Sequence, residues 1–134
     1  MSEEIRTVLS KIERETLREI RGMAPNSGSS VFVITPSIAR DILTRVWPGQ
    51  RKLRQQRVTE LTRMIRGGQF EMTHQGLLFD TEGYLHDGQH RLAACVMSGV
   101  NIRVQCSVTN NPKVYQVLDQ GAKRTVADMY GASK

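Results

Sequence analysis

Five consecutive residues, Asp87-Gly88-Gln89-His90-Arg91, stand immediately before an apolar run with helical spacing. A polar loop that leads into a helix is typical of an anion site, because the first N–H groups of a helix lack intrahelical partners and the helix dipole is positive there. Gly88 lets the backbone approach a ligand or adopt a positive φ, and Arg91 supplies a forked donor suited to phosphate or carboxylate. This 87–91 loop therefore predicts phosphate binding, the alternative being a tight turn that only caps the helix.

Asp87 and His90 are the candidates for a catalytic role within the 87–91 loop. Asp87 could orient His90 or Arg91, coordinate Mg²⁺ together with a bound triphosphate, or act as a simple helix N-cap. Since neither a nucleophile nor a general base is evident, catalysis stays open. His74, His86 and His90 could suggest a metal site, but His86 ends a predicted strand and His90 begins a helix. Their spacing need not place both on one face, and we expect no metal ligand.

Positive charge is concentrated between residues 45 and 66, where seven Lys or Arg residues are opposed only by Glu60. The 134-residue chain carries 19 Lys and Arg against 13 Asp and Glu, a net charge of +6 that favours nucleic acids, nucleotides or acidic proteins as partners. Contact with a DNA phosphate backbone is one interpretation of the concentrated charge, and a solvated helix face is the other. The candidate nucleic-acid contacts are Arg51, Lys52, Arg54, Arg63 and Arg66.

The elements that must position these residues follow from hydrophobic periodicity. Residues 3–21 repeat apolar side chains at about 3.6 positions, which predicts an amphipathic helix that packs on the domain or binds a second copy or a partner protein. Thr35 and Pro36 predict the start of another helix, and Gly67 and Gly68 the end of a third. Strands are expected over residues 31–34, 76–80, 84–86 and 100–108.

This order of elements predicts a small mixed α/β (α+β) domain, a sheet with flanking helices. We divide the chain into an N-terminal amphipathic helix (1–24), a linker (25–30) and one domain (31–134). Two cysteines outside any CxxC spacing and the lack of an apolar signal segment predict a reduced, cytoplasmic setting. No apolar run approaches the roughly 20 residues that a bilayer requires, so no membrane span is expected.

The segment from Asp87 to Ala94 resembles the signature of the ParB/sulfiredoxin superfamily, whose members carry a G-x-H-R or G-E-R-R loop between a strand and a helix. Two further motifs, Ile34-Thr35-Pro36 and Asp119-x-Gly121-x-x-Arg124-Thr125, are similar to the ParB-like proteins common in phages and mobile elements. The resemblance covers about residues 31 to 129. It implies a ParB/sulfiredoxin-like fold and a nucleotide-binding protein of a DNA-associated process in the host cytoplasm.

The resemblance also implies roles for single residues. His90 and Arg91 match the pair that sulfiredoxin and related serine kinases use to hold nucleotide phosphates, and Arg57 aligns with a basic phosphate-binding position. Gln89 stands where sulfiredoxin has its catalytic cysteine, which excludes sulfinic acid reduction because an amide is no thiolate nucleophile.

The implied ligand is an NTP with Mg²⁺, and NTP hydrolysis or phosphoryl transfer would be the corresponding activities. A non-catalytic DNA-binding or regulatory module is the alternative. The polar residues near position 120 could close over the same pocket or form a solvated loop. The expected phosphate-binding residues are Arg57, Gly88, Gln89, His90, Arg91, Asp119, Lys123 and Arg124.

Overall fold

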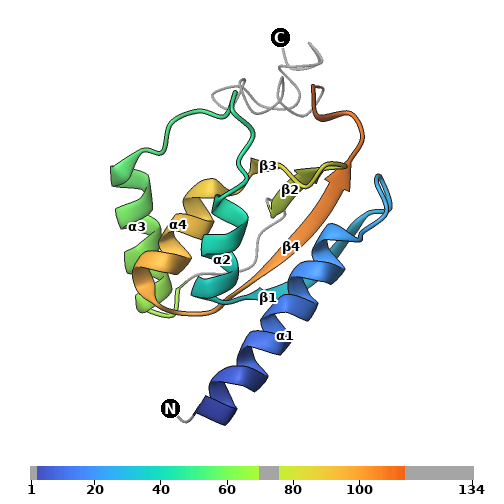
Figure 1. Ribbon diagram of the computed structural model, residues 1–134. Coiled ribbons are helices and arrows are strands. Elements are labelled where there is room, and N and C mark those ends of the chain that lie inside the picture. The colour runs from blue at the N-terminus through green and yellow to red at the C-terminus, as the bar shows by residue number, and fades with distance from the viewer. Residues whose placement is uncertain (1–2, 70–75, 114–134) are drawn as a thin grey trace.

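A computed structural model describes the backbone of residues 3–69 and 76–113 and the side chains from residue 10 onward (Figure 1). The helices are α1 (Glu3–Arg21), α2 (Pro36–Leu43), α3 (Gln55–Arg66) and α4 (Gln89–Ser98). The strands are β1 (Ser29–Ile34), β2 (Leu77–Asp80), β3 (Leu85–Asp87) and β4 (Ile102–Thr109). The mixed α+β class predicted from the sequence is therefore confirmed. Asp119, Lys123 and Arg124 lie outside the described residues.

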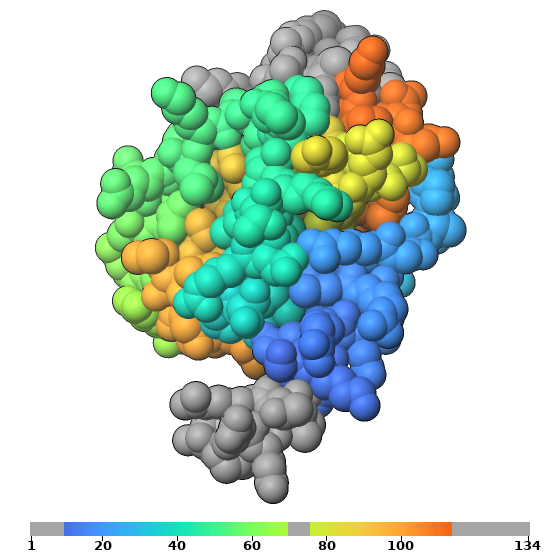
Figure 2. All heavy atoms as spheres, in the orientation of Figure 1, coloured from blue at the N-terminus to red at the C-terminus, as the bar shows by residue number. Residues whose placement is uncertain are grey.

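The four strands form one open sheet in the order β1-β4-β2-β3. β4 runs antiparallel to β1 and parallel to β2, while β2 and β3 form an antiparallel hairpin. The helices α2 and α4 lie over one face of this sheet, and α3 lies on the outer side of α4 (Figure 1). The space-filling view shows α1, α2 and α3 on the visible face, with α4 between α2 and α3 and the yellow β2–β3 hairpin beside them (Figure 2). None of the helices in the described part of the chain is long and apolar enough to cross a membrane.

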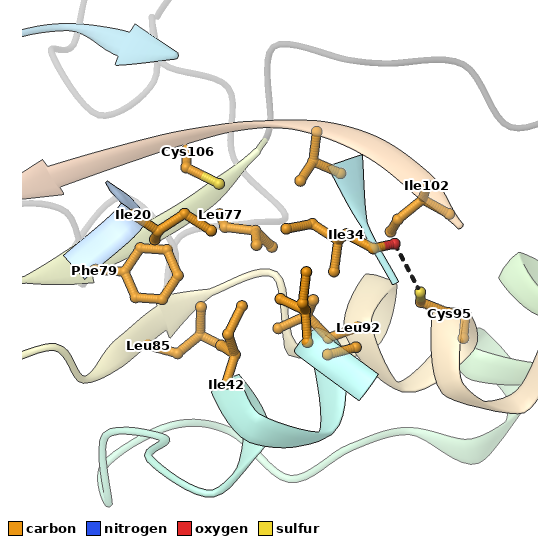
Figure 3. Close-up of a cluster of buried hydrophobic side chains, with 14 of the residues drawn as sticks. Ile20, Ile34, Ile42, Leu77, Phe79, Leu85, Leu92, Cys95, Ile102 and Cys106 are labelled. Carbon is orange, nitrogen blue, oxygen red and sulfur yellow. Dashed lines mark hydrogen bonds between the residues drawn. The ribbon is translucent and has the colours of Figure 1, made fainter. Parts of the chain in front are cut away.

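The core forms between the sheet and the helices. Alternation along β4 buries Ile102, Val104, Cys106 and Val108 and leaves Arg103 exposed, as the period of two in the sequence predicts. The Cys95 thiol of α4 lies 3.5 Å from the Ile34 carbonyl oxygen of β1, which ties the helix layer to the edge of the sheet (Figure 3).

The helix α1 contributes to the same core. Ile20 is 1% exposed and lies among Leu77, Phe79 and Cys106 (Figure 3). Within the expected linker, the Asn26 N–H donates to the Val108 carbonyl at 2.8 Å, and β1 already begins at Ser29. The sequence predicted either packing of the N-terminal helix on the domain or binding of a partner. The described part of α1 packs on the domain.

Capping residues set the ends of α2 and α4. Thr35 caps α2, accepting a hydrogen bond from the Ile38 N–H at 3.1 Å, and Pro36 occupies the first turn as predicted. At α4 the N-cap is Gly88, which has φ +104°. The suggestion that Asp87 caps this helix is therefore wrong, because Asp87 is the last residue of β3.

Backbone pairing at the sheet edge carries the chain toward the 87–91 loop. The Leu85 N–H donates to the Arg45 carbonyl and the Trp47 N–H to the Leu85 carbonyl, both at 2.9 Å. This places residues 45–47 alongside β3 in a parallel bridge at Val46. The chain that follows, the basic segment (residues 51–57), consequently runs beside the loop at the end of β3.

Candidate anion-binding site

A cavity of about 390 Å³ lies between the 87–91 loop and the basic segment. Among the described residues, five cationic side chains line it, together with one carboxylate, that of Asp87. Arg57 shares this surface with the loop, as the resemblance implies. Arg51, Lys52 and Arg54, which the sequence analysis treated separately as nucleic-acid contacts, lie on it as well. We call it the anion cavity. Besides the 87–91 loop, its lining comprises Gln50, Arg51, Lys52, Arg54, Arg57 and Leu61.

Two side chains of the loop hold the basic segment through its backbone. The buried Gln89 amide donates from Nε2 to the Arg51 carbonyl oxygen. The His90 ring accepts at Nε2 from the Arg54 N–H at 3.0 Å, and Arg54 is the N-cap residue of α3. Gln89 and His90 therefore hold the backbone from which the cationic side chains extend, and both position the wall of the cavity.

Gly88 is required by the local geometry. Its φ of +104° belongs to the left-handed region that L side chains rarely adopt, and a Cβ there would lie 2.4 Å from Leu77 Cδ2. Gly88 has no side chain, so it gives the first-turn N–H groups of α4 no side-chain cap. The sequence-based argument for an anion site at this helix start is compatible with this geometry.

Arg91 is anchored within the protein. Its Nη1 donates to the Gly76 carbonyl oxygen at 2.8 Å and lies 4.0 Å from Asp87 Oδ2. The guanidinium has five donors in a fixed fork, and the residue lines the cavity. Arg91 therefore joins the start of β2 to the end of β3 and contributes its charge to the cavity at the same time.

The electrostatics of the cavity disfavour additional positive charge. Burial lowers the pKa of His90 below its ordinary value, and the nearby Arg54, Arg57, Arg51 and Arg91 side chains lower it further. His90 is consequently neutral near pH 7, in agreement with Nε2 acting as an acceptor. An anion in the cavity would offset the repulsion among these groups.

The sequence-predicted residues divide into three groups. Arg57 and the whole 87–91 loop line the anion cavity, as do Arg51, Lys52 and Arg54. Arg63 and Arg66, also expected to bind nucleic acid, line a different groove between α3 and α4. Asp119, Lys123 and Arg124 fall outside the described residues, so the expected closure of the cavity by their loop stays a prediction.

Sequence reasoning missed the contacts that bring loop and basic segment together, along with Gln50 and Leu61 in the cavity wall. The helix break at Trp47-Pro48-Gly49 marked a turn, but nothing in it indicates that the following residues pair with Gln89 and His90. Those contacts join residues 36 to 38 positions apart and depend on the edge pairing of residues 45–47 with β3.

A second polar cluster lies within the β2–β3 hairpin. The His86 ring, which is 2% exposed, contacts Asp80 Oδ2 through Nε2 at 2.7 Å and stacks on Trp47 with centroids 5.3 Å apart. Burial alone would raise the pKa of Asp80, but hydrogen bonds from His86 and from the Tyr84 and Glu82 amides hold it below its ordinary value. This pairing stabilises the β2–β3 turn and engages His86 Nε2 within the hairpin.

The carboxylate of Asp87 is the group of the cavity that suits Mg²⁺. A protein site for Mg²⁺ needs only one or two carboxylates when phosphate oxygens and water complete the octahedron. Asp87 fits this requirement, with its oxygen 4.0 Å from the Arg91 guanidinium. Among the described side chains, residues 10–69 and 76–113, no three His, Cys, Asp or Glu groups come together as a self-sufficient metal site.

The likeness of the 87–91 loop to the ParB/sulfiredoxin superfamily rests on the residues themselves and stays a prediction. The geometry of the anion cavity therefore carries the functional proposal. Comparisons of the chain with protein-family models, with curated proteins and with solved structures found no match.

Proposed function

We propose that the anion cavity binds the phosphate groups of a nucleoside triphosphate. The observation that carries this proposal is the convergence of five cationic side chains and the N-terminus of α4 on one concave surface with a single carboxylate. Phosphate oxygens accept charge-assisted hydrogen bonds from guanidinium groups, and helix N-termini favour anions.

The cationic side chains would serve in two ways. Arg91 is held by Gly76 and would present a fixed charge. Lys52, Arg54 and Arg57 are exposed, so they can reorient toward a ligand. Arg57 Nη1 lies 3.6 Å from Glu60 Oε2 in a surface ion pair. Such pairs contribute only about 0 to 1 kcal/mol to stability. Arg57 would therefore lose little free energy when it leaves Glu60 to bind a phosphate.

The proposed function is the binding of a nucleoside triphosphate, and it does not require hydrolysis. Asp87 would contribute to Mg²⁺ coordination beside the phosphates, and the ion would neutralise phosphate charge. Because His90 Nε2 already accepts from the Arg54 N–H, this nitrogen would act as a general base only after that bond opened.

Duplex DNA is the second candidate ligand. The exposure of Arg51, Lys52 and Arg54 along one short segment favours it, since a DNA backbone could contact all three. The separation of Arg63 and Arg66 into another groove weakens it, because the five candidate contacts then present no single basic face.

Calorimetric titration of the full chain with each NTP, with and without Mg²⁺, tests the proposal. Inorganic triphosphate serves as a probe of phosphate recognition alone. We expect saturable binding that Arg57→Gln weakens by about tenfold, the loss of one charge-assisted hydrogen bond. Arg63→Gln is the matched control, because it removes the same charge from the same helix outside the cavity.

Absence of NTP binding at millimolar concentrations would overturn the proposal. Equal weakening by Arg57→Gln and Arg63→Gln would reduce the effect to net charge and count against a site. A parallel titration with duplex DNA at several salt concentrations addresses the second candidate, for which the logarithm of affinity should fall linearly with the logarithm of salt.

A further inference from the structure

A groove of about 720 Å³ lies between α3 and α4, apart from the anion cavity. Leu53, Val58, Ala93 and Met97 supply its apolar surface. Met97 is 62% exposed and Leu53 is 46% exposed, so two large apolar side chains of this groove face solvent. Exposed apolar side chains gathered in one depression are a common feature of ligand-binding grooves and protein interaction surfaces.

Arginines border this groove on the α3 side. Arg66 donates from Nη2 to the Met97 carbonyl oxygen at 2.9 Å, which holds its guanidinium at the C-terminal end of α4. Arg63 lies on the same helix and is exposed. Among the described residues that line the groove, none is acidic, and the nearby Glu60 faces Arg57 instead.

We propose that this groove binds an amphipathic helix of another protein, with acidic residues beside its apolar side. Apolar side chains of the partner would cover Leu53, Val58 and Met97, while its carboxylates would face Arg63 and Arg66. Recognition of an amphipathic helix by an apolar groove uses anchors at helical spacing, and α3 offers 12 residues, about 18 Å at 1.5 Å per residue.

Charge complementarity favours an acidic partner over parts of this chain. The helix α1 has five Glu residues and five Lys or Arg residues, so it offers no excess of negative charge. Residues 114–134 contain two Asp residues against three Lys or Arg residues. A second complete copy carries a net charge of +6, which would repel the first.

A displayed library of amphipathic helices with fixed leucines at helical spacing and random flanking residues tests the proposal. The full chain is the bait. We expect the selected helices to be enriched in Asp and Glu at the flanks. Synthetic peptides of these sequences, measured by fluorescence anisotropy, should bind wild type and lose about tenfold in affinity to Met97→Glu and several-fold to Arg63→Glu.

Met64→Glu is the matched control, since Met64 is an exposed methionine of α3 outside the groove. It should leave peptide affinity unchanged, and none of the three variants should lose the unfolding transition of wild type. The proposal fails if no binder depends on Met97, or if peptides with Lys flanks bind as well as those with Glu flanks. It also fails if peptides of residues 3–21 or 114–134 displace the selected peptides. The same holds if wild type sediments as a dimer that Met97→Glu dissociates.

Discussion

At the scale of single residues, two side chains of the 87–91 loop form hydrogen bonds within the protein, although the sequence predicts them as ligand contacts. Gln89 and His90 hold the carbonyl of Arg51 and the N–H of Arg54, so they bring the basic segment to the N-terminus of α4. Five like charges gathered around one cavity repel one another, and the fold must hold them there. The hydrogen bonds from Gln89 and His90 supply part of that restraint.

The pH dependence of stability tests this role of His90. The folded-state pKa of His90 lies below its ordinary value of 6.5, because of burial and then of the surrounding arginines. The unfolded chain therefore takes up the His90 proton first, and stability falls as the pH drops below about 6.5. We expect a shallower loss in His90→Gln, whose amide oxygen keeps an acceptor without titrating.

Urea denaturation of both proteins between pH 8 and pH 5 measures this difference. The comparison of wild type with His90→Gln cancels the other titrating groups, which the two proteins share. Parallel stability curves would contradict a neutral, acceptor role for His90. Added triphosphate should diminish the difference, because a bound anion raises the pKa of His90 toward its ordinary value.

At the scale of elements, Thr35 joins α1 to α2. Its hydroxyl accepts from the Ile38 N–H at the start of α2 and donates to the Glu13 carboxylate of α1. One side chain thus caps one helix and binds another. The sequence predicted the cap, because Thr before Pro at a helix start is a local pattern, but the contact with Glu13 spans 22 positions.

Substitution of Thr35 should separate these contributions. We expect Thr35→Val to lower the free energy of unfolding by about 1 to 2 kcal/mol, through loss of the cap and of the α1 contact. Thr35→Ser retains the hydroxyl and should stay within about 0.5 kcal/mol of wild type. Chemical denaturation measures both, and a loss in Thr35→Ser as large as that in Thr35→Val would contradict the assignment of the effect to the hydroxyl alone.

At the scale of the whole molecule, the described part of α1 is integrated into the core. Ile20 is 1% exposed and belongs to the same cluster as Leu77 and Cys106, whereas Ile12 on the same helix is 52% exposed. The helix pattern in the sequence fits both a packed helix and one that binds a partner. Burial of Ile20 distinguishes the two for this end of the helix.

Replacement of the two isoleucines by alanine tests the integration of α1. Ile20→Ala should lower the free energy of unfolding by about 2 to 5 kcal/mol, because it leaves a cavity in the common core. Ile12→Ala makes the same chemical change at an exposed position and should cost no more than about 0.5 kcal/mol. Thermal unfolding followed by circular dichroism compares them, and similar small effects would show that α1 folds apart from the rest.

Local patterns in the sequence determine much of the fold. The strand periods, the Thr35 cap, the glycine at the end of α3 and the hairpin before the 87–91 loop each depend on neighbouring residues, so they are visible in a linear chain. The same holds for the prediction of phosphate binding by the 87–91 loop, because a helix start and its flanking residues are consecutive.

Only the tertiary structure decides which charges share a surface. Arg51, Lys52, Arg54 and Arg57 join the 87–91 loop, while Arg63 and Arg66 face an apolar groove, although all belong to one basic stretch of the sequence. The division follows from the pairing of residues 45–47 with β3 and from the packing of α3 on α4. These contacts link distant positions, and net charge or periodicity along the chain carries no information about them. The 87–91 loop could therefore be predicted in advance as a candidate anion site, while the cavity beside it is a property of the folded molecule.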